Sequence, residues 1–285
     1  MESLATWNYA AAVVHLVATI LSAVLLTSKA RRTVQLVRYE FNDGAPPQDS
    51  RVDIPVRLKN DVKVDLKYLL VGFFGVTALA HFLYATDFFG RGWYSSAVLG
   101  FGWNPYRWVE YSISAGLMIY LISIASGTKD QVTAVSAALI TPGLMVNGFT
   151  NERALQQNAL HAWSLDPSNV AKPTVDAEIV FSNLIPAWLL FFVHWYIIFS
   201  NYGALSKEAK AANKPLDPGV TFMVYSQLFF FSLFGVIQTY QVYRWFTSRP
   251  GRIEWSFLTY EKAYIVLSAV TKLLLAATVF YALRN

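Results

Sequence analysis

The chain has 285 residues, of which 55% are hydrophobic and only 14% are charged. A water-soluble domain carries about a quarter charged residues, so this composition excludes an ordinary soluble fold and indicates a polytopic membrane protein. The absence of cysteine excludes disulfides, thiolate nucleophiles and cysteine metal sites. A net charge of +5 is ordinary for a membrane protein with basic loops, and the pattern gives no indication of nucleic-acid binding.

Seven apolar segments are long enough to be membrane-spanning helices, since about 20 residues cross a bilayer. They lie near residues 7–28, 67–89, 105–126, 131–149, 177–200, 219–243 and 257–283. The first is too long for a signal-peptide core and has no basic leader, so we expect it to be a retained span. Thr141-Pro142-Gly143 interrupts the fourth, where neighbouring helices can cover the freed backbone groups. The sequence therefore predicts residues 1–285 to be one all-α domain, a seven-helix membrane bundle.

One long connection, residues 29–66, separates the first two spans. Residues 33–41 and 51–58 alternate between apolar and polar side chains, and residues 42–47 between them form a turn cluster of Asn, Asp, Gly, Ala and Pro. This pattern predicts a short β-hairpin, and a flexible loop is the alternative. Because an isolated two-stranded hairpin is marginally stable, we expect it to pack on the helix ends or on a second protomer.

The seventh span carries one lysine, Lys272, near its middle. A lysine at the bilayer centre costs about 2.5 to 3.5 kcal/mol on insertion scales, so it is rarely there without a use. A buried amine can lose its proton and attack a carbonyl to form a Schiff base. The alternative is a lysine that faces a water-filled cavity or pairs with a carboxylate. Ser268 lies one turn earlier, where its hydroxyl can bond the lysine nitrogen or its own helix backbone.

The third span places Arg107, Glu110 and Ser114 on one helix face, at spacings of three and four residues. Glu110 is the carboxylate within the body of this span, and pairing it with Lys272 avoids two unpaired buried charges. We expect Arg107, one turn nearer the membrane surface, to help keep Glu110 ionised. A structural ion pair with no ligand is the alternative.

Two histidines, His15 and His81, lie in the otherwise apolar first and second spans. They are candidates for interhelical hydrogen bonds or, near Glu110, for a cluster that holds a proton. The phenylalanines of the sixth span pack the core or wall an elongated apolar ligand. The motifs of the common enzyme classes are absent from the sequence, so we expect no enzymatic activity and no metal site.

A seven-helix bundle with a lysine in the last span and a carboxylate in the third resembles the microbial rhodopsins, and within them the heliorhodopsin family. The similarity extends through all seven spans. The features that carry it are the segment Arg-Trp-Val-Glu-Tyr-Ser-Ile-Ser at 107–114, the His15 and His81 pair, Ser268 with Lys272, the pair Gln238 and Gln241, and the strand-forming connection after the first span.

This resemblance implies retinal, all-trans in the dark, bound to Lys272 as a protonated Schiff base with Glu110 as its counterion. It implies that Ser114 and Ser268 hydrogen-bond the Schiff base, and that His15 and His81 line a proton-holding cavity. Glu152 becomes a possible partner of Arg107. The other residues expected around the cofactor are Tyr111, Met118, Asn147, Phe231, Phe234 and Gln238.

Two departures from ion-pumping relatives favour a light sensor. A pump carries a proton donor eleven residues after the third-span carboxylate, where this chain has Leu121, and an aspartate four residues before the lysine, where it has Ser268. A proton that leaves the Schiff base has no evident relay from the far side, so we expect slow signalling rather than pumping. The alternatives are a light-gated or light-driven ion pathway and a retinal-free transporter that uses Lys272 and Glu110 as a charge pair.

Orientation is predicted differently by two arguments. Lysine and arginine are more numerous in the loops opposite the N-terminus, which places the N-terminus outside by the positive-inside rule. The resemblance implies instead a cytoplasmic N-terminus and an outer long connection that takes part in dimer contacts. We follow the resemblance and expect an integral protein of the cell membrane, surrounded by lipid, homodimeric, with a signalling partner still to be identified.

Overall fold

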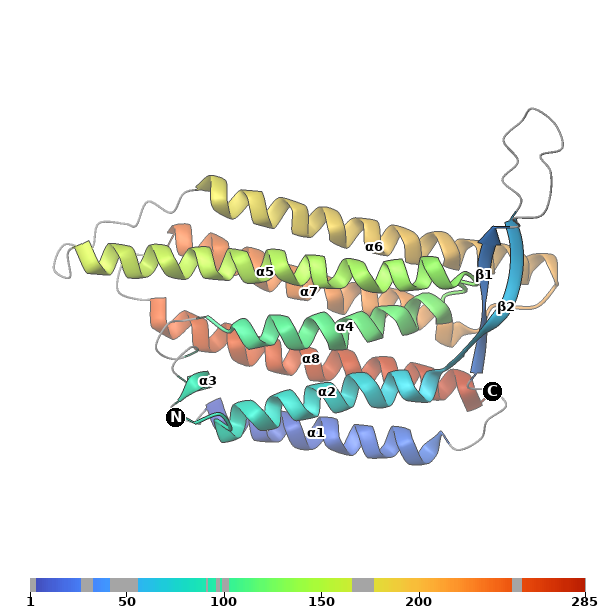
Figure 1. Ribbon diagram of the computed structural model, residues 1–285, viewed down its shortest axis with the longest axis horizontal. Helices are drawn as coiled ribbons and strands as arrows, with labels where there is room; N and C mark the ends of the chain where they lie inside the picture. The colour runs from blue at the N-terminus through green and yellow to red at the C-terminus, as the bar shows by residue number, and fades with distance from the viewer. Residues whose placement is uncertain are drawn as a thin grey trace.

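The computed structural model describes residues 4–26, 33–41, 56–90, 92–95, 98, 103–165, 177–247 and 253–284. Within them, seven long helices lie side by side, and a two-stranded hairpin stands beside one end of the bundle (Figure 1). In chain order the elements are α1 (Leu4–Leu25), β1 (Thr33–Phe41), β2 (Val56–Asp65), α2 (Leu66–Thr86), α3 (Trp93–Ser95), α4 (Pro105–Ala125), α5 (Gln131–Leu165), α6 (Ala177–Ala211), α7 (Pro218–Thr247) and α8 (Ile253–Arg284).

The seven long helices are each apolar and long enough to cross a membrane, which confirms the predicted seven-span bundle. Their outward faces carry large apolar side chains: Val13, Leu139 and Tyr196 are 59, 66 and 75% exposed. Such faces suit contact with lipid, where a helix also satisfies its backbone hydrogen bonds internally. The structure lengthens two predicted spans, because α5 continues to Leu165 and α6 to Ala211.

Pro142 lies inside α5, and the helix continues through it. A proline lacks the backbone N–H and so removes one hydrogen bond from the helix interior. Both α4 and α6 pack along α5, and Leu190 of α6 lies against Gly143, next to the proline. α6 likewise continues through Pro186.

The hairpin pairs β1 with β2 in antiparallel register, from Thr33 opposite Asp65 to Phe41 opposite Val56. The predicted second strand, residues 51–58, is wrong in its bounds: β2 runs from Val56 to Asp65, while residues 51–55 and the predicted turn at 42–47 lie outside the described residues. The alternation of apolar and polar side chains breaks at the polar run Lys59-Asn60-Asp61 and resumes at Val62, so local periodicity did not show that the strand continues to Asp65.

The hairpin packs on the helix ends, which was one of the two predicted arrangements. The pairing is irregular between Leu36 and Arg38, and at this point the Val37 N–H donates a hydrogen bond to the Lys129 carbonyl at 2.8 Å. Lys129 lies in the connection between α4 and α5. The Leu36 side chain is fully buried in the main hydrophobic core, so the hairpin is joined to the bundle by packing as well as by hydrogen bonds.

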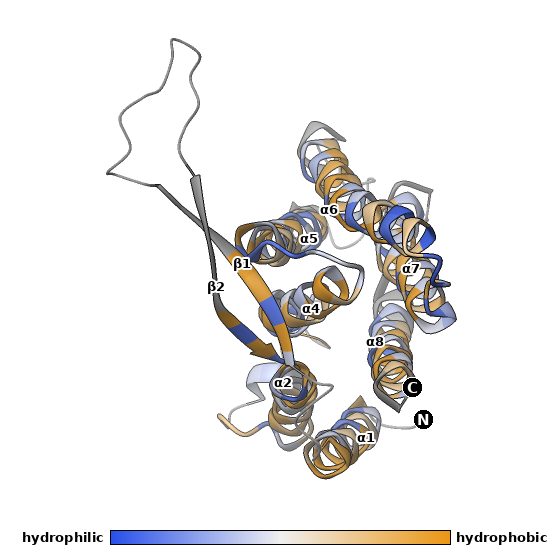
Figure 2. Ribbon diagram, turned by 90° about the vertical axis from the view of Figure 1, so that its right-hand side faces the viewer, coloured by the Kyte–Doolittle hydropathy of each residue, from blue (hydrophilic) through white to orange (hydrophobic). Residues whose placement is uncertain are grey.

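The bundle has two central helices, α4 and α8, which are the most buried of the seven spans. In the view along the bundle, α4 lies inside, with α2 and α5 beside it and α8 across from it (Figure 2). These are the helices that carry Glu110 and Lys272. The fold therefore holds both predicted charged residues away from lipid.

Candidate functional site

Lys272 and Glu110 form an ion pair in the interior of the bundle. The Lys272 Nζ lies 3.1 Å from Glu110 Oε1, and the two side chains are only 3% and 4% exposed. The lysine also donates a hydrogen bond to Ser268 Oγ at 2.8 Å, as the one-turn spacing predicts. On the other side, the Thr77 hydroxyl of α2 donates to Glu110 Oε1. Three helices thus meet at one carboxylate, and the predicted pairing of Glu110 with Lys272 is confirmed.

A cavity opens beside this ion pair. Its walls are mostly apolar and aromatic, and Lys272 is part of them. The lysine nitrogen also lies 5.3 Å from the centre of the Tyr111 ring. An apolar molecule in this cavity would therefore have a buried amine within reach.

Most residues expected around a cofactor line this cavity. The structure places there Ser114, Tyr111, Met118, Phe231, Phe234, Gln238 and Ser268. Asn147 differs, because its amide donates a hydrogen bond to the Gly143 carbonyl of its own helix at 2.9 Å and does not contribute to the wall. The Ser114 hydroxyl is buried in the cavity wall one helical turn after Glu110, where it can bond that carboxylate or a ligand.

Trp188 and Tyr264 also line the cavity and were not predicted from the sequence. Trp188 lies against Gly235, where a Cβ atom would come within 2.9 Å of the indole ring. Both aromatic residues belong to apolar helices whose facing sides the sequence alone does not specify. The available signal in the sequence was Gly235, which lies among the aromatic residues of its helix. A glycine there lets an aromatic ring of a neighbouring helix come close to the backbone.

The two histidines lie together, and His81 is one turn along α2 from Thr77, which bonds Glu110. The rings of His15 and His81 are stacked with centroids 5.7 Å apart, and both are buried. His15 Nδ1 bonds the Ala11 carbonyl at 2.7 Å, and His81 Nδ1 lies 2.8 Å from Asn8 Oδ1. Both histidines therefore make the interhelical or local hydrogen bonds expected of buried imidazoles.

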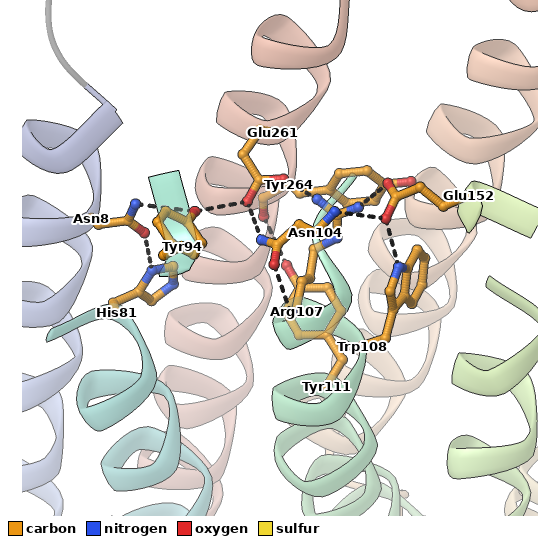
Figure 3. Close-up of polar contacts among 10 residues, drawn as sticks. All are labelled: Asn8, His81, Tyr94, Asn104, Arg107, Trp108, Tyr111, Glu152, Glu261 and Tyr264. Atoms are coloured by element: carbon orange, nitrogen blue, oxygen red, sulfur yellow. Dashed lines mark hydrogen bonds and ion pairs between the residues drawn. The ribbon is translucent and has the colours of Figure 1, made fainter. Parts of the chain in front are cut away.

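Arg107 forms ion pairs with Glu152, as the resemblance implies, and with Glu261 (Figure 3). All three side chains are 3% exposed or less. The guanidinium also stacks on the Tyr264 ring, 4.1 Å from its centroid. Arg107 thus neutralises carboxylates at the N-terminal end of α4, while Glu110 takes its cation from Lys272. This differs from the expected role of Arg107 beside Glu110.

Glu261 was not predicted from the sequence either, although its spacing within the last span is informative. Glu261 lies eleven residues before Lys272 in the same span, which is close to three helical turns and hence the same face. Its carboxylate accepts hydrogen bonds from Asn104 Nδ2 at 2.7 Å and from the Tyr94 hydroxyl at 3.3 Å. A second inward-facing charge on α8 was therefore readable from the spacing alone.

Comparison with known proteins decides the family. A family model described as Heliorhodopsin matches residues 4–283. The chain belongs to the heliorhodopsin family. No curated protein matches the sequence. Membership in the heliorhodopsin family makes the chain a retinal protein of the microbial rhodopsin type, integral to a membrane, and the apolar cavity that ends at a buried amine fits an apolar aldehyde.

Proposed function

We propose that this heliorhodopsin is a light sensor that binds all-trans retinal through a protonated Schiff base on Lys272, with Glu110 as the counterion. The observation that carries the proposal is the position of the Lys272 nitrogen, which is in the cavity wall and 3.1 Å from a buried carboxylate. Bound retinal supplies the absorption of visible light and a double bond that isomerises.

The surrounding side chains have distinct roles in this proposal. Ser268 orients the Lys272 nitrogen through its 2.8 Å hydrogen bond, and Thr77 orients the Glu110 carboxylate from the other side. Ser114, one helical turn after Glu110 in the cavity wall, offers a further hydrogen bond to the carboxylate or to the Schiff base. Phe231 and Phe234 exclude water from the apolar part, together with Tyr111 and Met118. Gln238 closes one wall by donating to the Gly148 carbonyl at 3.0 Å.

We infer that His15 and His81 hold the proton that leaves the Schiff base. His81 and Thr77 are one turn apart on α2, and Thr77 touches Glu110, so the histidine pair lies next to the counterion. The buried Nε2 atom of His15 has no hydrogen-bond partner among the described residues, which suits a site that takes up a proton or a bridging water.

Signalling rather than pumping is supported by the apolar side chains packed around Leu121. Leu121, at the position of a pump's proton donor, is fully buried. It lies in an apolar cluster with Phe73, Phe74, Ile119 and Ile122. Proton transfer needs a hydrogen-bonded partner at each step, and this cluster supplies apolar side chains at that depth. We infer a slow photocycle whose product is a conformational signal.

We further propose that the protein is a homodimer in the cell membrane with a cytoplasmic N-terminus. The hairpin, docked through Leu36 and Val37, is a candidate for the dimer contact because its outer edge extends from the bundle (Figure 1). Cross-linking between cysteines introduced into the hairpins of two protomers tests the contact. Labelling of a cysteine placed near Leu4 in intact cells tests the orientation.

Reconstitution with all-trans retinal tests the proposal. We expect a visible absorption band in the wild type and none in Lys272→Ala. We expect Glu110→Gln to move that band to longer wavelength or to replace it with an ultraviolet-absorbing, deprotonated form, because the positive charge loses its carboxylate. An unchanged spectrum in Glu110→Gln would mean that another residue is the counterion.

A light-gated ion pathway is the second candidate, and one observation favours it. The chain of polar contacts from His81 through Asn8 and Tyr94 to Glu261 gives a hydrogen-bonded route across the bundle, from α2 through α1 and α3 to α8 (Figure 3). Illumination under voltage clamp separates the candidates. A sustained photocurrent would refute the pure sensor, and its absence with an intact visible band would support it.

A further inference from the structure

Two polar atoms in the cavity wall have no hydrogen-bond partner within the part of the chain that the structure describes. They are Oγ1 of Thr141 on α5 and Nε2 of His194 on α6. The two residues are 2% and 3% exposed. A buried polar group without a partner is costly, so native proteins rarely leave one unpaired. Two such atoms in the wall of one cavity indicate that its occupant supplies their partner.

Thr141 differs from the hydroxyl residues that are satisfied by their own helix. Ser112, Ser232 and Thr271 each donate a hydrogen bond to the carbonyl four residues earlier at 2.7 Å. Thr271 does so although it lines the same cavity. Thr141, which directly precedes Pro142, makes no such bond to any described residue. Its hydroxyl is therefore available to a molecule in the cavity.

Thr141 and His194 lie at similar depth in the bundle. α5 and α6 run in opposite directions (Figure 1), and Gly143 of α5 faces Leu190 of α6, whose Cδ1 would lie 3.7 Å from a Cβ atom at the glycine. Thr141 comes two residues before Gly143, and His194 comes four residues after Leu190. In antiparallel helices both offsets lead the same way, by about 3 and 6 Å at roughly 1.5 Å per residue. The two side chains therefore belong to one part of the cavity wall.

This part of the wall is across the cavity from Lys272. In the view along the bundle, α5 and α6 lie at one side and α8 at the other, with α4 and α7 between them (Figure 2). All five helices contribute residues to the wall. A molecule that is attached to Lys272 and extends along the cavity brings its far end toward Thr141 and His194.

Retinal has no atom that can satisfy these two groups. Its single oxygen leaves as water when the aldehyde condenses with the Lys272 amine, and the ring at its far end is a hydrocarbon. A threonine hydroxyl can donate or accept a hydrogen bond, and so can a nitrogen of a neutral imidazole, depending on the tautomer. A hydroxyl group between them would donate to one and accept from the other.

We propose that Thr141 and His194 form a subsite for a hydroxyl group on the retinal ring, so that this chain prefers a ring-hydroxylated retinal to retinal itself. The subsite rests on the proposed attachment of the chromophore to Lys272. Its surroundings are apolar: Leu144 follows Thr141 by about one turn and Phe191 precedes His194 by about one turn, and both line the cavity. A hydroxyl enters such surroundings favourably only if it is hydrogen-bonded, so its recognition depends on the two polar side chains.

Competition between two aldehydes tests the subsite. The retinal-free protein is equilibrated with an excess of an equimolar mixture of all-trans retinal and all-trans 3-hydroxyretinal. The bound chromophores are then released with hydroxylamine and quantified by chromatography. We expect the wild type to take up the hydroxylated aldehyde in about three- to ten-fold excess, the effect of one or two buried hydrogen bonds.

Two variants assign the preference to the subsite. We expect His194→Phe and Thr141→Val, which keep the approximate size of each side chain, to lower the uptake ratio by about three-fold or more. Because the ratio is measured within one sample, a variant that binds both aldehydes more weakly still reports it, and either variant is sufficient if the other fails to fold. The matched control is Thr150→Val on the same helix, whose hydroxyl donates to the Val146 carbonyl and which is not part of the cavity wall; it should keep the wild-type ratio.

The outcomes separate the subsite from the attachment of retinal. Equal uptake of the two aldehydes by a wild-type sample with a visible absorption band overturns the subsite alone. A ratio that is unchanged in a folded His194→Phe or Thr141→Val variant also overturns it. If neither aldehyde produces a visible band, the attachment to Lys272 is refuted and the subsite with it.

Discussion

Replacing Glu110 with glutamine removes the carboxylate that neutralises Lys272 and keeps the size of the side chain. At 3.1 Å, and with an effective dielectric constant of about 20, the attraction between the two charges is about 5 kcal/mol. Breaking a buried pair by removing one partner destabilises proteins by about 3 to 5 kcal/mol, because the remaining charge is uncompensated. We therefore expect Glu110→Gln to lower the unfolding free energy of the retinal-free protein by that amount.

Denaturant unfolding in detergent measures this loss, and a double-mutant cycle assigns it to the pair. In the double variant Glu110→Gln with Lys272→Met no charge remains buried at the site, so we expect it to be more stable than Glu110→Gln alone. Glu208→Gln breaks an exposed pair with Lys129 and should cost about 0 to 1 kcal/mol. A loss below about 1 kcal/mol for Glu110→Gln, or additive single variants, would refute the buried ion pair.

Three further predictions follow from other contacts. Burial raises the pKa of Tyr94, so above about pH 10 the folded state keeps a proton that the unfolded state loses. The unfolding free energy then falls by up to about 1.4 kcal/mol for each pH unit above that value. We expect Tyr94→Phe to reduce this alkaline slope, measured by thermal unfolding at a series of pH values. Gly148→Ala places a methyl group against the Trp108 ring and should cost about 1 to 3 kcal/mol, whereas Gly203→Ala, with open space around it, should cost nothing. Arg107→Gln leaves two buried carboxyls without a cation and should destabilise by about 3 to 5 kcal/mol, with Arg107→Lys losing less.

Each of these predictions has a result that would contradict it. Equal alkaline slopes for wild type and Tyr94→Phe would mean that the hydroxyl is not held in a buried, neutral state. Equal unfolding temperatures for the two alanine variants would mean that the close approach of α4 and α5 is relaxed in solution. If Arg107→Gln were as stable as the wild type, the ion pairs of Arg107 would not stabilise the fold.

The ion pair at the centre of the molecule could be predicted because charge is expensive in a bilayer. Lys272 and Glu110 each interrupt an apolar span, and only pairing avoids the cost of both, so composition and helical spacing were sufficient. Ser268 followed from its place one turn before the lysine. The seven spans followed from length and hydropathy in the same way.

Features that depend on how helices rotate and pack could not be predicted in this way. Asn147 is at a plausible depth, but its amide bonds the preceding turn of its own helix. Arg107 was expected beside Glu110, yet its long side chain reaches two other carboxylates. The inward position of Glu261 could be read from its spacing to Lys272, but its partners could not, because Tyr94 and Asn104 come from α3 and from the N-cap of α4.

The hairpin shows a different limit. Alternation correctly predicted two strands, but the second was placed too early because the end of an alternating segment does not fix the pairing register. The register here is accompanied by the contact of Val37 with Lys129, which belongs to a distant part of the chain. Long-range contacts of this kind are not encoded in local periodicity.

The most direct test of the central proposal is to find the lysine that carries retinal. The protein reconstituted with all-trans retinal is reduced with borohydride, which adds hydride to the imine carbon and leaves a stable secondary amine, and the peptides are examined by mass spectrometry. We expect a retinyl group on the peptide that contains Lys272, and no adduct in Lys272→Ala. A retinyl group on another lysine, or none on a sample with a visible band, would contradict the account.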